Sequence, residues 1–325
     1  MLHGSLSPSA CCGCFCRCCS THRQHRVLQK LRKCVFELQV LDLANSWLPD
    51  ADAAELAQSL QNLPLLEHLN ISTNPLWDDG ALALVAVLPS LLHLTFLNLS
   101  ETCVSSFEVS KLLASLCHLT ALHSLNISSI CDGRDHKVGP AGAFELSNAL
   151  RKLTQLHTLN VAANDFGHGF AALAPALGEL VYISRLIIGD QLLPVDSAAA
   201  LGAALARLPS LHYLDMSGMS PQVVEVFSPG NAWSPCTAIT ELVLSGCDLG
   251  DVGVAELGPS VACMSSLVRL GLARNGLSEL GVHALARHLA TLLDLRSVNF
   301  RSNEVSSRGY MLRLREPSLQ DIAVF

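Results

Sequence analysis

The sequence has few charged and few aromatic residues, and it lacks the short motifs of the common enzyme classes. Of its 325 residues, 15% are charged and 5% are aromatic, whereas 50% are hydrophobic. It contains no Ser-His-Asp order, no His-Glu-x-x-His pair and no glycine-rich phosphate loop. The sequence therefore predicts a protein that is not an enzyme and that needs no cofactor and no metal.

Signals for export and for membrane insertion are missing as well. The N-terminus has no continuous apolar segment ahead of its basic residues, so we expect no secretory signal. The apolar run from Gly80 to Leu99 is interrupted by Pro89 and by polar residues, and it reads as helix, turn and strand rather than as a membrane span. Cysteines scattered beyond residue 33 are typical of small core side chains in a reducing compartment. We expect a cytoplasmic protein, with the nucleus as a second location.

Acidic residues are absent from the first 33 residues, and basic residues are scarce in the middle of the chain. Residues 1–33 carry six bases and no acid, residues 34–266 hold 7 bases against 23 acids, and residues 267–325 hold 8 bases against 5 acids. Nowhere is there the basic stripe of a dedicated nucleic-acid-binding protein, so direct sequence-specific binding of nucleic acid is not expected.

What the sequence does contain is a repeat. The segment Leu267-Val-Arg-Leu270-Gly-Leu272-Ala-Arg-Asn275 has leucines at relative positions 0, 3 and 5 and an asparagine at 8. Leucines at that spacing pack inward from a strand, and the asparagine amide can bind the backbone as the chain leaves the strand. The opening residue of this motif recurs at Leu38, Leu66, Leu94, Leu122, Leu156, Ile183, Leu211, Ile239, Leu267 and Leu295.

The interval between these residues is 28, apart from 34 between the fourth and fifth and 27 between the fifth and sixth. This period leaves room for a strand, a turn, a helix and a return loop. Apolar residues at helical spacing over residues 54–60, 81–88 and 283–289 predict the helices, and Pro64, Pro89 and Pro209 lie where helices should end. The predicted domains are a Cys-rich basic segment over 1–33 that is disordered, an array of ten repeats over 34–316 and a C-terminal tail or cap over 317–325.

This pattern resembles the ribonuclease-inhibitor class of leucine-rich repeats, over residues 35–316. The resemblance implies an α/β fold, a leucine-rich repeat solenoid or horseshoe with a parallel concave sheet and convex helices. Asn74, Asn164, Asn275 and Asn303 fit the motif at position 8. Other residues stand there in six repeats: Ser46, Thr102, Ile130, Gln191, Met219 and Cys247.

The end of the chain is similar to the last repeats of NOD-like receptors. The evidence is the segment Asp248-Leu-Gly-Asp-Val-Gly-Val-Ala-Glu-Leu257 and the tail Leu312-Arg-Leu-Arg-Glu-Pro-Ser-Leu-Gln-Asp-Ile-Ala-Val-Phe325, which is closest to the class I MHC transactivator type. The resemblance implies a C-terminal fragment or short isoform of such a receptor, acting in innate immune signalling or in regulation of MHC class I gene expression. The alternatives are a ribonuclease-inhibitor-like binder or ubiquitin-ligase adaptor and, third, a GTPase-activating repeat protein.

Three other features have both a functional and a structural interpretation. The cluster Cys11–Cys19 could hold zinc or accept an acyl group, or it could belong to a disordered start. The segments 131–137 and 228–235 are partner contacts or neutral loops. The same repeat position holds His123, His157 and His212, but no carboxylate recurs with them, which favours surface histidines over a metal site. The repeat register also explains the Asn-x-Ser glycosylation sequons at Asn70, Asn98 and Asn126.

The concave sheet is where we expect a protein partner. Positions 2, 4, 6 and 7 after each opening leucine should face that surface or its edge. In the early repeats these positions are mildly polar. The later repeats supply arginine and tyrosine, which often anchor interfaces, although the arginines could equally serve solubility alone. The predicted partner-binding residues are Arg185, Tyr213, Glu241, Arg269, Arg274, Arg296 and Arg301. The identity of the partner and the oligomeric state do not follow from the sequence.

Overall fold

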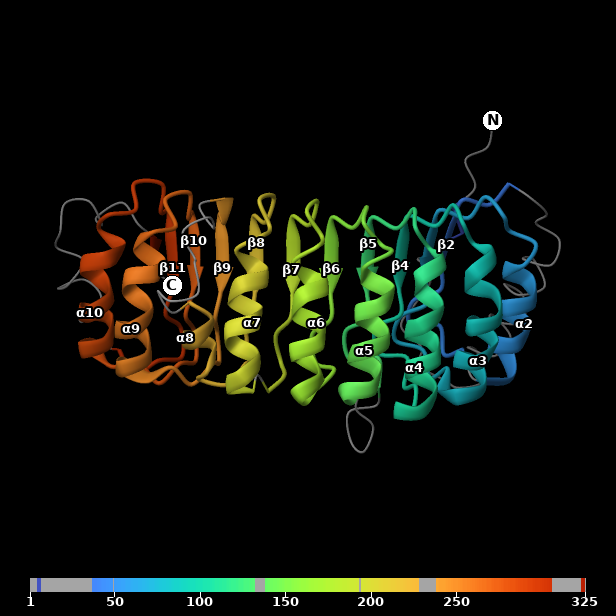
Figure 1. Cartoon of the computed structure of the whole chain (residues 1–325), viewed down its shortest axis with the longest axis horizontal. Coiled ribbons are helices and arrows are strands. Elements are labelled where there is room, and N and C mark those ends of the chain that lie inside the picture. The colour runs from blue at the N-terminus through green and yellow to red at the C-terminus, as the bar shows by residue number, and fades with distance from the viewer. Residues whose placement is uncertain are drawn as a thin grey trace, which may run out of the picture. The chain divides into compact units, whose positions relative to one another are not determined.

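The computed structural model describes residues 5–6, 37–48, 50–131, 138–192, 194–227, 238–305 and 323–324. The chain divides into two compact units, Met1–Gly169 (unit 1) and Phe170–Phe325 (unit 2), and each is described by itself. Figure 1 labels the helices and strands of both.

Unit 1 contains one parallel sheet whose strands pair in chain order. Its strands are β1 (Ser5–Leu6), β2 (Val40–Asp42), β3 (His68–Asn70), β4 (Phe96–Asn98), β5 (Ser124–Asn126) and β6 (Thr158–Asn160). Between them lie α2 (Asp50–Leu60), α3 (Trp77–Val87), α4 (Ser106–Ser115) and α5 (Gly139–Leu150), with the 3-10 helices η1 (Leu88–Ser90) and η2 (Leu116–His118), and a third 3-10 helix, η3 (Gly167–Gly169), follows β6. Strand and helix alternate, as the repeat predicted.

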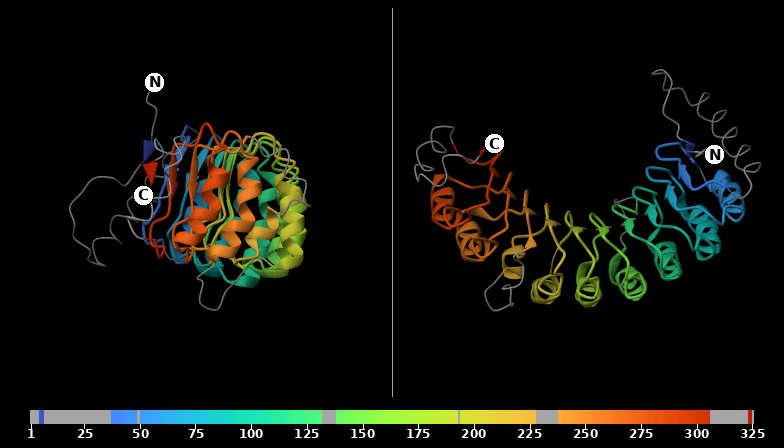
Figure 2. Two further views of the ribbon diagram at one scale, coloured as in Figure 1. Left: turned by 90° about the vertical axis from the view of Figure 1, so that its left-hand side faces the viewer. Right: turned by 90° about the horizontal axis from the view of Figure 1, so that it is seen from above.

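Unit 2 repeats this arrangement, and its paired strands are also parallel. Its strands are β7 (Arg185–Ile187), β8 (Tyr213–Asp215), β9 (Glu241–Val243), β10 (Arg269–Gly271), β11 (Ser297–Asn299) and β12 (Ala323–Val324). Its helices are α6 (Phe170–Leu177), α7 (Val195–Leu205), α8 (Val223–Val226), α9 (Gly250–Ala262) and α10 (Glu279–Leu289). Within each unit the helices lie on one side of the strands (Figure 2).

The leucines of the repeat form the core between sheet and helices. Leu267, Leu270 and Leu272 are each at most 1% exposed, and their counterparts in the other repeats are buried in the same way. The three-residue strands begin two residues after the opening leucine, so that the residue at position 3 is the buried centre of each strand. The structure thus confirms the fold class: a leucine-rich repeat solenoid with a parallel sheet and helices.

In four repeats, an asparagine at position 8 joins the repeat to the one before it. Asn74 is fully buried, its amide nitrogen donates to the carbonyl of Leu43 at 2.8 Å, and its oxygen accepts from the N–H groups of Ser46 and Leu48 at 3.0 Å. Asn164, Asn275 and Asn303 make equivalent bonds. Because one amide satisfies both donors and acceptors of buried backbone, it specifies the turn as well as the packing.

The residues that replace asparagine satisfy less of this backbone. Gln191 donates to the carbonyl of Ile188 at 2.7 Å, but its own oxygen is buried without a partner. Cys247 donates from its thiol to the carbonyl of Met216 at 3.2 Å. Ile130 and Met219 are buried apolar side chains at this position. The N–H of Ile130 is still held by the oxygen of Asn164 from the next repeat, at 3.1 Å, as at the other turns that precede an asparagine.

A left-handed residue precedes this position in every repeat. The residue at position 7 has a positive φ in all ten repeats, although only Gly218 and Gly246 among them are glycine. The others are Asn45, Thr73, Glu101, Ser129, Ala163, Asp190, Arg274 and Ser302. Since a side chain in this conformation costs about 1 kcal/mol, the backbone bonds around position 8 impose the turn on residues that do not favour it.

The predicted helices are present, and each begins earlier than its apolar pattern. The segments 54–60, 81–88 and 283–289 fall in α2, in α3 with the adjoining η1, and in α10. Pro175 and Pro259, which the sequence analysis did not anticipate in helices, lie inside α6 and α9.

Several sequence predictions fall outside the described residues. They concern the Cys11–Cys19 cluster, residues 132–137, residues 228–235 and most of the segments 1–33 and 317–325. In the described parts of the two end segments, β1 pairs with β2 and β12 pairs with β11, so both extend a sheet. Among the described helices, none is long and apolar enough to span a membrane.

Candidate functional site

The side chains at positions 2 and 4 stand on the face of the sheet that the helices leave uncovered, called here the open face. They flank the buried residue at position 3, and in most strands both are half-buried. This face varies from repeat to repeat while the core does not. It is therefore where specificity can be encoded.

Position 4 has a structural role in most repeats. The side-chain oxygen of Asn70 accepts bonds from the N–H and the hydroxyl of Ser72 at 3.3 and 2.8 Å, and Asn98 does the same for Ser100. The same bond to the N–H two residues on is made by Asp42, Asn126, Asn160, Asp215 and Asn299. These bonds close an Asx turn where the strand ends. The column of asparagines, including the sequons, is explained by this turn.

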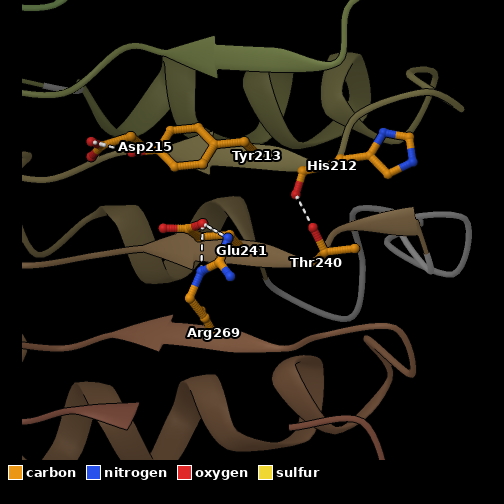
Figure 3. Close-up of polar contacts among 6 residues, drawn as sticks. All are labelled: His212, Tyr213, Asp215, Thr240, Glu241 and Arg269. Carbon is orange, nitrogen blue, oxygen red and sulfur yellow. Dashed lines mark hydrogen bonds and ion pairs between the residues drawn. The ribbon is translucent and has the colours of Figure 1, made fainter. Parts of the chain in front are cut away.

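Four of the predicted residues form one continuous row at position 2 of unit 2, called here the charged row: Arg185, Tyr213, Glu241 and Arg269. Strand register places each opposite the next. The Arg185 guanidinium lies 3.5 Å from the centre of the Tyr213 ring, a cation–π contact. Arg269 donates from Nε to Glu241 at 2.7 Å and from Nη2 to the same carboxylate oxygen (Figure 3).

Asp215 completes this network, and the sequence analysis missed it. The Tyr213 hydroxyl donates to Asp215 at 3.3 Å, and both residues lie on β8 (Figure 3). Desolvation and the Asp215 charge raise the pKa of Tyr213, and desolvation with the same charge raises the pKa of Asp190. The signal was present: position 4 carries an acid rather than an asparagine in this repeat.

A depression lies beside the charged row, over β9, β10 and β11. Its volume is about 340 Å³, and it is lined by Glu241, Val243, Ser245, Arg269, Leu270, Gly271, Ser297, Asn299 and Arg301. The structure therefore brings a fifth predicted residue, Arg301, to the same place as Glu241 and Arg269. Gly271, at the centre of the lining, contributes no side chain.

The two remaining predicted residues lie outside this arrangement. Arg274 is exposed at position 7 and is the left-handed residue of its turn. Arg296 is exposed one residue after Leu295, where its backbone N–H donates to the carbonyl of Val268 at 2.9 Å. Neither lines the depression.

The open face of unit 1 is less charged, and it holds an aromatic pair that the sequence analysis overlooked. The rings of His68 and Phe96, both at position 2, stack with centroids 4.0 Å apart. Burial lowers the pKa of His68 against the opposing influence of Asp42. A histidine and a phenylalanine at position 2 of successive repeats would have predicted this contact.

The histidines at position 1 are surface residues, as expected. His123, His157 and His212 are exposed, and each binds a carbonyl two residues earlier through Nδ1. The rings of His123 and His157 stack 5.2 Å apart. Within the described parts of the chain, no three His, Cys, Asp or Glu residues gather in a way that could hold a metal ion.

Comparison with known proteins agrees with the fold. The family described as Leucine Rich repeat matches residues 62–85 and 236–258. The ribonuclease inhibitor of Sus scrofa is 28% identical over 82% of this chain and 52% of its own length. The Tonsoku-like protein of Mus musculus is 30% identical over 70% of this chain and 17% of its own length.

A protein named NLRC5 from Ictalurus punctatus is 26% identical over 63% of this chain and 12% of its own length. The chain thus spans about half of the ribonuclease inhibitor, and far less of the other two. The chain has the leucine-rich repeat fold and ribonuclease-inhibitor-like relatives, and none of these comparisons indicates an enzymatic family.

Proposed function

We propose that this leucine-rich repeat protein binds a protein partner through the open face of unit 2, with the charged row at the centre of the contact. The observation that carries the proposal is the row itself: four side chains from four successive strands, held as two neighbouring pairs by a cation–π contact of Arg185 with Tyr213 and an ion pair of Arg269 with Glu241. Tyrosine and arginine are enriched among residues that dominate binding energy.

Stability does not account for the charged row. The side chains of Arg269 and Glu241 are 58% and 23% exposed, and ion pairs with that exposure contribute at most about 1 kcal/mol. The core leucines and the asparagines at position 8 hold the repeats together without these residues. Two neighbouring pairs of interface-type side chains that contribute little to stability are best explained by recognition.

The finer proposal is a binder of the ribonuclease-inhibitor type, acting in the cytoplasm and also in the nucleus. The ribonuclease inhibitors of Sus scrofa and Mus musculus support it, since they match 82% and 92% of this chain. Titrating the purified chain into a ribonuclease assay tests whether the chain binds and inhibits a ribonuclease. Stoichiometric inhibition supports it, and full ribonuclease activity at excess chain rejects ribonuclease as the target. Localisation is tested by imaging the tagged chain and by fractionating the cells.

A second candidate is a repeat region of NOD-like-receptor type, acting in innate immune signalling or in MHC class I gene regulation. The match to NLRC5 over 207 residues favours it. Sequencing the transcript upstream of residue 34 tests it. An in-frame ATP-binding domain supports this candidate, whereas a transcript without one rejects it.

The scaffold proposal itself is tested by capture with matched variants. The variant carrying Arg185→Ala and Tyr213→Ala removes half of the charged row. The control, Arg207→Ala with Arg287→Ala, changes exposed arginines of the same unit away from the open face. Quantitative mass spectrometry of captured proteins should show partners lost at least tenfold with the first variant and retained with the control. Partners retained by both variants would place the contact elsewhere.

A further inference from the structure

A groove lies between α9 and α10, on the helical side of unit 2 and away from the open face. The two helices stand side by side (Figure 1), and they approach closely where a Cβ at Gly281 would lie 2.2 Å from the carboxylate oxygen of Asp251. The groove has a volume of about 450 Å³. Its lining, called here the helix groove, is Asp251, Val252, Ala255, Glu256, Leu280 and Ala284.

Large apolar side chains project from both helices at this groove, and small ones complete its apolar lining. Val252 of α9 and Leu280 of α10 are 72% and 69% exposed. Ala255 follows the first by three residues and Ala284 follows the second by four, so each pair lies on one face of its helix. The apolar lining therefore extends along one turn of each helix, about 5.4 Å.

Folding does not account for Val252 and Leu280. Both stand thirteen residues after the opening residue of their repeat, where α3 carries Asp79 and α7 carries Asp196. An acid near the start of a helix is favourable because it interacts with the helix dipole. A large apolar residue that stays exposed there gains neither this interaction nor burial in the core. Two such residues on neighbouring helices are best explained by contact with another molecule.

The charge at the helix groove is negative, since none of its six lining residues is basic. Asp251 is held within the fold, because its carboxylate accepts bonds from the N–H of Ser278 at 2.8 Å and from the hydroxyl of the same residue. Glu256 is exposed and makes no hydrogen bond or ion pair with the residues that the structure describes. The helices of unit 2 carry five acids, Asp196, Glu225, Asp251, Glu256 and Glu279, against one base, Arg287.

We infer that the helix groove binds a basic amphipathic helix of a protein partner. Apolar side chains of that helix pack between Val252 and Leu280, and a lysine or arginine beside them pairs with Glu256. A helix suits the groove because its residues at i and i+4 lie one turn apart, which matches the apolar lining. The groove shares no residue with the charged row, so binding at one surface does not require the other.

Charge favours this occupant over a second copy of the chain and over a lipid surface. Two copies meeting through their helix grooves would bring Glu256 of each towards the acidic helices of the other. An anionic membrane would meet the same carboxylates. Like charges placed together across an interface weaken it, whereas a basic helix gains from Glu256.

The test uses the full chain and fluorescein-labelled peptides, followed by fluorescence anisotropy. The probe is a fourteen-residue peptide with leucines at helical spacing and with lysines and glutamines at the other positions. One comparison peptide has glutamate in place of lysine. The other has the composition of the probe, but leucine alternates with the polar residues. The wild-type chain should bind the probe at least about tenfold more tightly than either comparison.

The apolar part of the helix groove is tested by Val252→Ser with Leu280→Ser. This double variant should bind the probe at least about tenfold more weakly, because apolar surface is no longer buried. The control is Leu192→Ser with Leu293→Ser, which changes two leucines of unit 2 that are 66% and 85% exposed and lie outside the groove. The control should bind the probe as the wild-type chain does. Equal thermal midpoints by circular dichroism show that each variant is folded.

The charge of the helix groove is tested by Glu256→Gln. At low ionic strength this variant should bind the probe about threefold more weakly, the effect expected of one exposed ion pair. The control is Asp294→Asn, which removes the same charge from an exposed residue outside the groove and should leave binding unchanged.

Three results with the probe would overturn the inference. They are unchanged binding by the Val252→Ser and Leu280→Ser variant, an alternating peptide bound as tightly as the probe, and unchanged binding by Glu256→Gln. Sedimentation velocity and flotation with phosphatidylserine vesicles test the other two occupants. A dimer or vesicle binding that the double serine variant abolishes would assign the groove to a second copy or to a membrane, and would also overturn the inference.

The outcome is separable from that of the proposed function. The variant carrying Arg185→Ala and Tyr213→Ala should bind the probe normally, because the charged row lies on the other side of the sheet. Protein partners lost with that variant, together with a probe that ignores Val252 and Leu280, would keep the charged row as a binding surface and reject the helix groove. Partners retained by that variant, together with a probe lost with Val252→Ser and Leu280→Ser, would do the reverse.

Discussion

The side-chain oxygen of Asn275 accepts a hydrogen bond from the backbone N–H of Cys247 at 2.9 Å, and Cys247 lies 28 residues, or one repeat, earlier in the chain. Asn303 accepts in turn from the N–H of Asn275 at 2.8 Å. These bonds all run from a repeat to its predecessor, so each asparagine stabilises a turn that it does not belong to. A substitution at position 8 should therefore weaken two repeats together.

Replacing Asn275 by alanine should lower the free energy of unfolding by at least about 2 kcal/mol. The change leaves the carbonyl of Leu244 and the N–H of Cys247 buried without partners, and each such group costs about 1–3 kcal/mol. Urea unfolding followed by circular dichroism measures this effect. The control is Asn299→Ala, which affects one Asx turn at a half-buried position and should cost less. Equal losses for the two variants would contradict a special role for position 8.

Replacing Gly189 by alanine should destabilise unit 2 by at least about 2 kcal/mol. Its Cβ would lie 2.2 Å from the carbonyl oxygen of Ser217, a backbone atom that cannot move aside cheaply. Gly246→Ala is the matched control, because Gly246 has a φ of +70° but no heavy atom within 3.9 Å of its Cβ. That variant should lose only about 1 kcal/mol, the cost of a left-handed alanine. A thermal midpoint that falls further for Gly189→Ala than for Gly246→Ala supports the steric clash, whereas equal falls would contradict it.

Acid should weaken the contact between α9 and α10 through Asp251. Burial acts to raise the pKa of its carboxyl, but bonds from Ser278 and from the N–H of Gly281 outweigh it, and the pKa falls below its ordinary value. A lowered folded-state pKa gives stability that is fully present above the unfolded value of about 3.9 and is lost as the pH falls through the folded value. Asp251→Asn should therefore lower the urea midpoint at pH 7 more than at pH 3. An equal loss at both pH values would show that the charge is not involved.

The thiol of Cys247 should resist alkylation in the folded protein. Burial raises its pKa to about 12, and its Sγ donates to the carbonyl of Met216 at 3.2 Å. Since the thiolate is the reactive form, a rise of about three units above an ordinary thiol reduces its population about a thousandfold at pH 8. Brief iodoacetamide treatment and peptide mass spectrometry should find the exposed Cys263 modified and Cys247 intact. Rapid alkylation of Cys247 in the native chain would contradict this.

Much of the fold could be predicted because its signals are local and periodic. Leu267, Leu270 and Leu272 recur at a spacing that buries them on one side of a strand, and apolar helical patterns follow at a fixed distance. The position of the candidate site followed from the same register, which places Arg185, Tyr213, Glu241 and Arg269 on one face. The same register also places Asp215 and the His68–Phe96 pair on this face, but the sequence analysis did not single out Asp215 and described the early repeats only as mildly polar.

The sequence by itself determined the repeat, its core and which residues share the open face, since each depends on side-chain periodicity alone. Tertiary structure decided what periodicity does not constrain. It imposed a left-handed turn on residues as different as Thr73, Ala163 and Arg274, because backbone bonds between repeats outweigh local preference. It also separated the predicted arginines, because Arg269 and Arg301 line one depression over three strands whereas Arg274 and Arg296 lie outside it.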